Sequence, residues 1–144
     1  MGKPKKEKDV RFSKFGTVSF TATTKVNDFI DYLEKGEVRG TKCKSCGKVF
    51  FPPRADCYSC LSSDMEWFKV EGAGKLITFS ILRYAPIGFG DDLPYAIAVV
   101  DYGDYKVFGR IGDIDLDQVQ CGMEVVVRAN ELPNGQLNYV FDKA

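Results

Sequence analysis

The sequence predicts a mainly β protein with an N-terminal helical segment, a small cysteine-bound metal ribbon and a small closed β barrel, in that order. Three observations support this fold class: apolar residues at helical spacing before residue 36, two Cys-x-x-Cys pairs within residues 43–60, and short β-type runs separated by glycines from residue 66 onward. The chain has 144 residues, of which 44% are hydrophobic. That length and composition suit one ordinary domain or two small ones.

Changes in composition divide the chain into four segments. Residues 1–20 hold the basic cluster MGKPKKEKDVR and are expected to form a mobile extension. Residues 21–37 form a helical segment and residues 38–65 form the metal ribbon. Residues 66–144 then supply the strands of the barrel.

An amphipathic helix is predicted over residues 25–35, KVNDFIDYLEK. Its apolar side chains recur at i, i+3, i+4 and i+7, namely Val26, Phe29, Ile30 and Leu33. Gly36 follows, as is typical just past a helix C-terminus. We expect the apolar stripe to pack in the core, and a partner- or ligand-facing role is the alternative.

Four cysteines form two Cys-x-x-Cys pairs with ten residues between them: Cys43, Cys46, Cys57 and Cys60. Structural disulfides are rare in the cytosol, where we expect this chain, and a thioredoxin-like redox pair would occur only once. Two such turns instead present four thiolates that complete a tetrahedron around Zn²⁺. The chain contains no histidine, so the ligand set is Cys₄. Such a site is closed to water and substrate and therefore structural, with iron in a rubredoxin-like site as the main competitor.

A stiff corner lies between the two cysteine pairs. Pro52-Pro53 fixes the φ angle at two positions and removes two backbone donors. Arg54 follows this corner. One interpretation pairs Arg54 with Asp56 or Asp64 at the surface, and the other makes it an anchor for a partner protein or an anionic ligand. The local residues by themselves favour the surface interpretation.

The second half of the chain consists of short runs rich in Val, Ile, Phe and Tyr, which favour strands. Asn134-Gly135 is a strong hairpin signal, and Gly103-Asp104 marks another turn. About five strands with such glycine punctuation predict a small closed barrel of OB type, with an SH3-like barrel as the alternative. The candidate strands are MEWFKV, KLITFSILRY, YAIAVVDY, YKVFGRI, MEVVVRA and LNYVFD.

One loop, YAPIGFGDDLPY over residues 84–95, is unusually rich in apolar residues. It contains Tyr84, Pro86, Phe89, Pro94 and Tyr95. Apolar side chains are costly to expose in a connection between strands. The loop therefore either folds back to cap the barrel or contacts a partner.

Charge and composition argue against several classes of function. Lys+Arg 20 and Asp+Glu 20 give a formal net charge of zero, which makes nucleic-acid binding unlikely on electrostatic grounds. No apolar run reaches the ~18 residues of a membrane helix, and no apolar segment follows the N-terminal lysines as in a secretory signal, so a cytoplasmic protein is expected. Without histidine, the usual general base near neutral pH is missing, which argues against an enzyme.

Several short motifs occur in a fixed order. Gly36–Gly47 reads G-x-x-x-G-x-x-C-x-x-C-G, and Phe51–Cys60 reads F-P-P-R-x-x-C-x-x-C. Glu66-Trp67, the G-x-G-K-L-x-T-F-S run of Gly72–Ser80, Pro94-Tyr95 and the G-M-E-V run of Gly122–Val125 follow. Over residues 25–144 this pattern resembles the DUF35 family, OB-fold proteins with a rubredoxin-like zinc ribbon that are associated with acyl-CoA metabolism. The resemblance implies two N-terminal helices, a zinc ribbon and a C-terminal OB barrel. Leu61 stands where a glycine usually follows the fourth cysteine.

The resemblance also implies a function. It predicts a non-catalytic accessory or scaffold subunit that binds a thiolase-type or other acyl-CoA enzyme and supports transfer or binding of an acyl-CoA such as acetoacetyl-CoA. The alternatives are a nucleic-acid-binding protein and a stand-alone acyl-CoA-binding protein, in which Arg54, Lys75 or Arg83 would face the CoA phosphates. The candidate partner- or ligand-binding residues are Phe51, Pro52, Pro53, Arg54, Arg83, Tyr84, Phe89, Pro94 and Tyr95.

Overall fold

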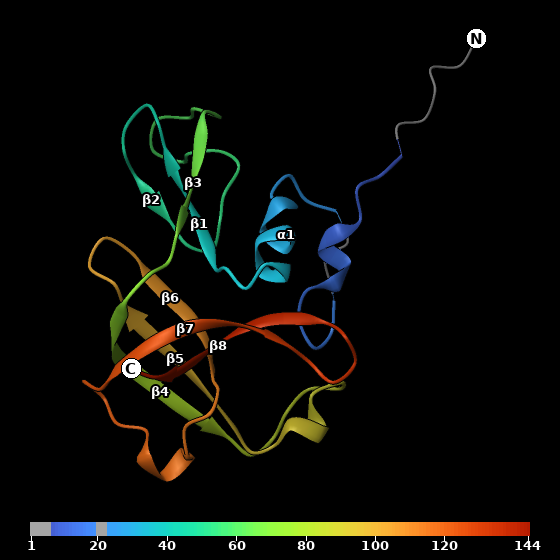
Figure 1. The fold of residues 1–144 in the computed structure, drawn as a ribbon, viewed down its shortest axis with the longest axis vertical. Helices are drawn as coiled ribbons and strands as arrows, with labels where there is room; N and C mark the ends of the chain where they lie inside the picture. Colours follow the sequence, from blue (N-terminus) through green and yellow to red (C-terminus); the bar gives the residue numbers. More distant parts are fainter. Residues whose placement is uncertain (1–6, 20–22) are drawn as a thin grey trace.

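The fold consists of a three-stranded ribbon and a closed five-stranded barrel with one α-helix between them (Figure 1). The structure is a computed structural model and describes residues 7–19 and 23–144. The ribbon strands are β1 (Arg39–Cys43), β2 (Val49–Phe50) and β3 (Met65–Lys69). The barrel strands are β4 (Ala73–Leu82), β5 (Tyr95–Asp101), β6 (Lys106–Ile111), β7 (Glu124–Glu131) and β8 (Leu137–Lys143).

The barrel closes in the order β4-β5-β6-β8-β7, with β7 pairing back onto β4. All neighbouring barrel strands are antiparallel except β6 and β8, which pair in parallel through Arg110–Val140 and Ile111–Phe141. Asn134-Gly135 lies in the hairpin between β7 and β8, as the sequence predicts, and Gly135 adopts a φ of 83° there. Side chains of β5 alternate between buried and half-buried, as expected for a strand with one face in a barrel core.

The predicted N-terminal helices are overstated, because the described residues contain one α-helix, α1 (Asp28–Glu34). It is shorter than the predicted residues 25–35, but it buries the predicted side chains Phe29, Ile30 and Leu33. The other helical element before the ribbon is a single 3-10 turn, η1 (Arg11–Lys14). The chain leaves this turn at Gly16, whose φ of 82° cannot continue a right-handed helix.

The N-terminal segment predicted as a mobile extension contacts the rest of the molecule over part of its length. The Phe12 ring lies 6.2 Å from the Phe29 ring, and the Phe15 ring lies 5.7 Å from it. Phe15 also forms an isolated parallel bridge with Leu137 of β8. Apolar contact with α1 and β8 therefore holds residues 12–15 against the barrel, whereas residues 1–6 and 20–22 lie outside the described part of the chain.

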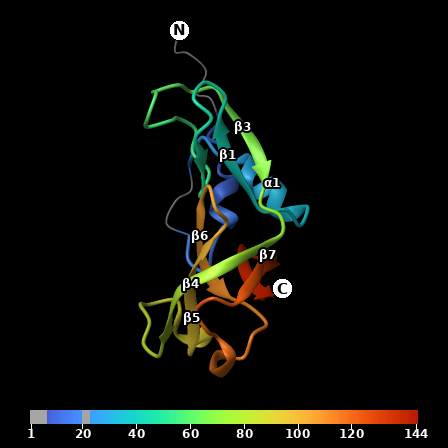
Figure 2. The ribbon, with the colours of Figure 1, turned by 90° about the vertical axis from the view of Figure 1, so that its left-hand side faces the viewer.

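One apolar core unites α1, the base of the ribbon and the barrel interior. It includes Phe29 of α1 and the neighbours Val38 and Val70 at the base of the ribbon. From the barrel it includes Val100, Val107 and Phe141. A second, small cluster of Cys43, Phe50, Cys57 and the half-buried Met65 lies within the ribbon. Figure 2 shows the ribbon standing on one end of the barrel. In the described part of the chain, no helix has the length and apolar character needed to cross a membrane.

Candidate functional site

The four cysteines lie on two turns of the same shape. Cys43 ends β1, and the turn after it returns the chain to β2, while Cys57 begins a second turn that leads toward β3. The N–H of Gly47 donates to the carbonyl of Cys43 at 2.9 Å, and the N–H of Leu61 donates to the carbonyl of Cys57 at 3.0 Å. Gly47 has a φ of 79° and Leu61 a φ of 62°. The second turn is therefore regular although it carries leucine in place of glycine.

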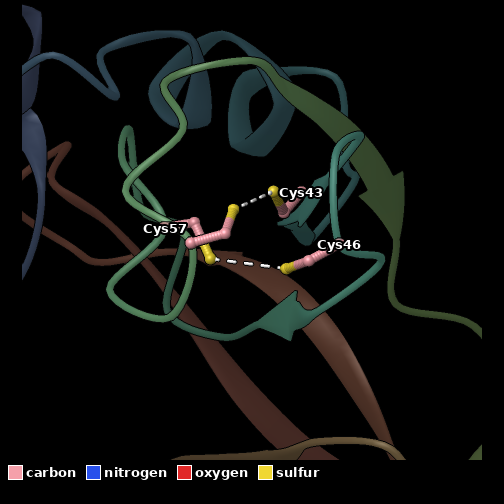
Figure 3. A group of neighbouring side chains, drawn as sticks. Cys43, Cys46 and Cys57 are labelled. Atoms are coloured by element: carbon pink, nitrogen blue, oxygen red, sulfur yellow. Dashed lines mark hydrogen bonds between the residues drawn. The ribbon is translucent and has the colours of Figure 1, made fainter.

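The turns bring the four sulfur atoms together. All four Sγ atoms lie within 4.8 Å of one another, with Cys43–Cys60 at 3.5 Å and Cys46–Cys57 at 3.6 Å. Figure 3 shows these sulfur atoms facing one another. Four thiolates bonded to one Zn²⁺ at ~2.3 Å in a tetrahedron stand about 3.8 Å apart. The cluster has the geometry of a tetrahedral metal site.

Backbone donors inside each turn favour the thiolate form that binds metals. The N–H of Cys46 donates to the sulfur of Cys43, with a further N–H from Ser45, and lowers the pKa of Cys43 to about 6. In the second turn, the N–H groups of Cys60 and Ser59 likewise lower the pKa of Cys57. Because a thiolate rather than a thiol is the metal ligand, the backbone prepares the first cysteine of each turn for metal binding. The neighbouring cysteine side chains and burial instead raise the pKa of Cys60 to about 12.

The predicted corner holds Arg54 in a defined position. Its backbone N–H donates to Oγ1 of Thr41 at 2.8 Å, and the Thr41 hydroxyl donates to the carbonyl of Arg54 at 2.9 Å. The Arg54 guanidinium lies 5.7 Å from the Phe50 ring centroid and 5.3 Å from that of Tyr58. Among the described residues no ion pair joins Arg54 to an acidic side chain, and Asp64 pairs with Lys44 instead. Thr41, buried on β1, is a positioning residue that the sequence did not reveal.

The corner residues face in different directions. Phe51 is half-buried, and its ring lies 6.4 Å from the Phe29 ring and 5.4 Å from the Tyr139 ring. It therefore packs between the ribbon and the barrel. Pro52 and Arg54 are exposed, and Pro53 is half-buried. The peptide bond between Phe51 and Pro52 is cis.

The remaining candidate residues lie on the barrel, apart from the corner. Arg83, Tyr84 and Pro94 are exposed, and Tyr84 retains 91% of its accessible surface. Phe89 and Tyr95 are half-buried and both face the guanidinium of Arg110, at 5.6 Å and 4.1 Å from ring centroid to Cζ. Residues 84–95 thus divide into an exposed tip and an inward-facing part. The structure brings Phe89 and Tyr95 together but leaves them in a different part of the molecule from Arg54.

Arg110 is a residue that sequence reasoning missed. It lies on β6, and its Nη1 is 2.9 Å from Oδ2 of Asp92 in the loop before β5. No sequence pattern connects the two residues, because the pairing of β5 with β6 places the loop before β5 beside Arg110. The pair lies beside an apolar cavity that is described below.

Comparison with known proteins agrees with this architecture. The model of the rubredoxin-like zinc ribbon domain of ChsH2 matches residues 31–66, and the model of its C-terminal OB-fold domain matches residues 67–130. A DUF35 domain-containing scaffold protein of Methanothermobacter thermautotrophicus is 33% identical over 114 residues, covering 75% of this chain and 86% of that protein. The chain belongs to the DUF35 family.

Other relatives of this DUF35 protein match over shorter stretches. A DUF35 domain-containing scaffold protein of Methanocaldococcus jannaschii is 36% identical over 88 residues, which is 60% of this chain and 62% of that relative's length. The benzoylsuccinyl-CoA thiolase subunit BbsA of Thauera aromatica is 28% identical over 75 residues, 51% of each chain. The solved structure titled Ltp2-ChsH2(DUF35) aldolase superposes with a TM-score of 0.71 at 20% identity, covering 84% of this chain and 96% of that chain. That superposition shows a shared fold.

Proposed function

We propose that this DUF35 protein is a non-catalytic accessory or scaffold subunit that binds a thiolase-type enzyme and supports acyl-CoA binding or transfer there. The observation that carries the proposal is the cluster of four cysteines. A metal bound by all four would have no free coordination position for water or substrate, so the site would be structural. The names of the relatives support the proposal, since three are scaffold proteins and a fourth is a thiolase subunit. The chain also contains no histidine.

The metal of the ribbon is proposed to be Zn²⁺, with iron as a possible occupant in recombinant protein. Cys43, Cys46, Cys57 and Cys60 would hold it. A bound metal supplies a cross-link between the two turns and no reactive centre. Its contribution to function is indirect, because it keeps the Arg54 corner and the second turn in place.

The proposed docking surface consists of the exposed ribbon residues Pro52, Arg54, Tyr58 and Leu61. Tyr58 is 58% exposed and Leu61 is 83% exposed. The Arg54 guanidinium is positioned over the Tyr58 ring, so the charge and the apolar surface are presented together. Aromatic and arginine side chains are enriched among residues that dominate protein interfaces.

The arrangement of the barrel favours this function over the two alternatives. The rings considered for stacking on bases are Tyr84, Tyr95, Tyr102, Tyr105 and Phe108. Tyr102 and Tyr105 stack on each other at 5.4 Å and 3° and Tyr95 lies against Arg110, while Tyr84 and Phe108 are exposed. The zero net charge argues against the nucleic-acid alternative. The cations considered for a CoA group are dispersed: Arg54 lies on the ribbon, Lys75 near the start of β4 and Arg83 just past its end. Lys75 and Arg83 lie at opposite ends of the ten-residue strand β4.

Co-purification tests the proposal. The protein is co-expressed with the thiolase-type protein encoded nearest to its gene, one partner is tagged, and the eluate is analysed by size-exclusion chromatography with light scattering. We expect a stable complex, weakened more than ~10-fold in Kd by Arg54→Glu because an interface anchor is reversed in charge. Lys143→Glu, an exposed cation on β8, is the control and leaves Kd unchanged.

Two outcomes would contradict the proposal at different levels. Separate elution of the two proteins at micromolar concentration would show that the thiolase-type protein is not a partner. A complex that forms equally well with Arg54→Glu would keep the partner but exclude the ribbon face as its docking surface.

A further inference from the structure

A cavity of about 500 Å³ lies between the N-terminal segment and the outer side of strands β5, β6 and β8. It is defined here as the barrel-face cavity. Its walls include the rings of Phe12, Phe15, Phe89, Tyr95, Phe108 and Tyr139. Neither the cysteine cluster nor the proposed docking surface contributes to it. Its size falls within the ~300–1,000 Å³ of small-molecule sites, which are also mostly apolar and aromatic.

The walls of the barrel-face cavity are held in place by the fold. Tyr139 is fixed because its hydroxyl donates to the carbonyl of Phe108 at 2.5 Å. Gly109 leaves room for that ring, since a Cβ at this position would stand 2.8 Å from the Tyr139 ring. At the edge of the cavity, Gly88 lies so close to Val18 that a Cβ there would clash with it. The fold therefore sets the shape of these walls, and the N-terminal segment meets the loop before β5 at Val18 and Gly88.

The charge of the cavity selects the kind of ligand. Among the described residues that line it, Arg110 is the single charged side chain. Its Nη1 is already paired with Asp92 at 2.9 Å, and its guanidinium stacks over the Tyr95 ring at 4.1 Å. The pair is neutral as a whole. A carboxylate or phosphate entering the cavity would lack a counter-charge, and placing an unbalanced charge among aromatic rings is costly.

The other terminal nitrogen of this side chain does not add a polar contact for a ligand. Nη2 of Arg110 is buried and has no partner among the described residues, and it is not accessible from the cavity. The polar lining of the cavity is therefore small, and its aromatic rings and paired guanidinium favour a ligand that is uncharged and mostly apolar.

We propose that the barrel-face cavity binds a neutral, predominantly apolar organic molecule. The proposal does not depend on the thiolase-type partner. It concerns a site on the isolated chain, on the barrel side of the molecule and distinct from the ribbon.

Fluorescence titration of the full chain tests this site. Nile red, a neutral apolar dye with a carbonyl group, serves as the probe, and 2-decanone and decanoate serve as competitors of equal chain length. We expect saturable binding, displaced by 2-decanone at a concentration at least ~10-fold lower than decanoate at pH 7.5. Ile97→Trp fills the cavity from β5 and should weaken dye binding at least ~10-fold.

The matched control is Ile77→Trp, which adds the same ring at an exposed position of β4 that does not line the cavity. It should bind the dye like the wild type, and thermal unfolding of both variants shows whether either fold is damaged. Absence of saturable binding, or equal binding by Ile97→Trp when that variant is folded, would overturn the site. Displacement by decanoate at the same or lower concentration than 2-decanone would overturn the neutral ligand class.

Discussion

Leu61 has a backbone conformation that favours glycine and an apolar side chain that is exposed to solvent. It is the one non-glycine residue with positive φ in the described part of the chain, and it is 83% exposed. A side chain in the left-handed region costs ~1–2 kcal/mol, and an exposed leucine recovers little of that through burial. The turn tolerates this strain because the N–H of Leu61 must donate to the carbonyl of Cys57. An exposed apolar side chain at this position fits the proposed docking surface, because a partner protein would bury it.

Leu61→Gly should stabilise the metal-loaded protein by up to ~1 kcal/mol. The gain from relieving the left-handed strain exceeds the ~0.4–1 kcal/mol that glycine loses through greater freedom of the unfolded chain. Thermal or urea unfolding of the metal-loaded protein measures the change. The reverse substitution, Gly47→Leu, is the control, since a Cβ at Gly47 meets nothing within 4 Å and the cost is purely conformational. Destabilisation by Leu61→Gly would show that the leucine side chain makes stabilising contacts.

The ribbon is the element whose structure depends most on a ligand. Its strands are short, β2 being two residues long, and its own apolar cluster holds few side chains. So small a sheet buries too little apolar surface to be stable alone. The four sulfur atoms converge between the two turns of the ribbon, where a metal would replace the missing apolar contacts.

Cys43→Ser should abolish stoichiometric metal binding and unfold the ribbon while the barrel stays folded. Structural zinc contributes on the order of 10 kcal/mol of apparent binding free energy in small ribbons, so its loss exceeds what the ribbon strands can supply. Metal content by mass spectrometry, fluorescence of Trp67 on β3 and far-UV circular dichroism measure the three consequences. Cys121→Ser is the control, because Cys121 is exposed and outside the cluster. Full metal content in Cys43→Ser, or none in the wild type, would exclude the metal site.

At the scale of the whole molecule, aromatic rings connect the ribbon to the barrel. Phe51 comes from the ribbon, Phe29 from α1 and Tyr139 from β8, and each ring lies within 6.5 Å of the other two. Burial at this junction raises the pKa of Tyr139. Because the three rings come from three different elements, the ribbon and the barrel of the metal-loaded protein should unfold together as long as the junction is intact.

Phe51→Ala should cost ~2 kcal/mol, less than for a fully buried phenylalanine, and should uncouple the ribbon from the barrel. Urea unfolding followed by Trp67 fluorescence would then precede unfolding followed by far-UV circular dichroism, whereas the two curves coincide in the wild type. Tyr84→Ala, which removes a ring that is 91% exposed, should change neither curve. Coincident curves for Phe51→Ala would mean that the junction does not couple the two parts.

Local patterns in the chain were sufficient to predict the cysteine cluster, the buried face of α1 and the strands β4 to β8. Each depends on residues close together in sequence: two Cys-x-x-Cys turns, the spacing of Phe29, Ile30 and Leu33, and alternating strands. The patterns were wrong for MEWFKV, which they assign to the barrel, because β3 pairs with β1 in the ribbon. The inward direction of Phe51, the clamp of Arg54 by Thr41, the Arg110–Asp92 pair and the barrel-face cavity were not predictable in this way. Each depends on contacts between elements that no periodicity relates. Thr41 meets Arg54 within the ribbon, and Asp92 meets Arg110 because β5 pairs with β6. The direction of Phe51 and the cavity arise only when the ribbon and the N-terminal segment pack on the barrel.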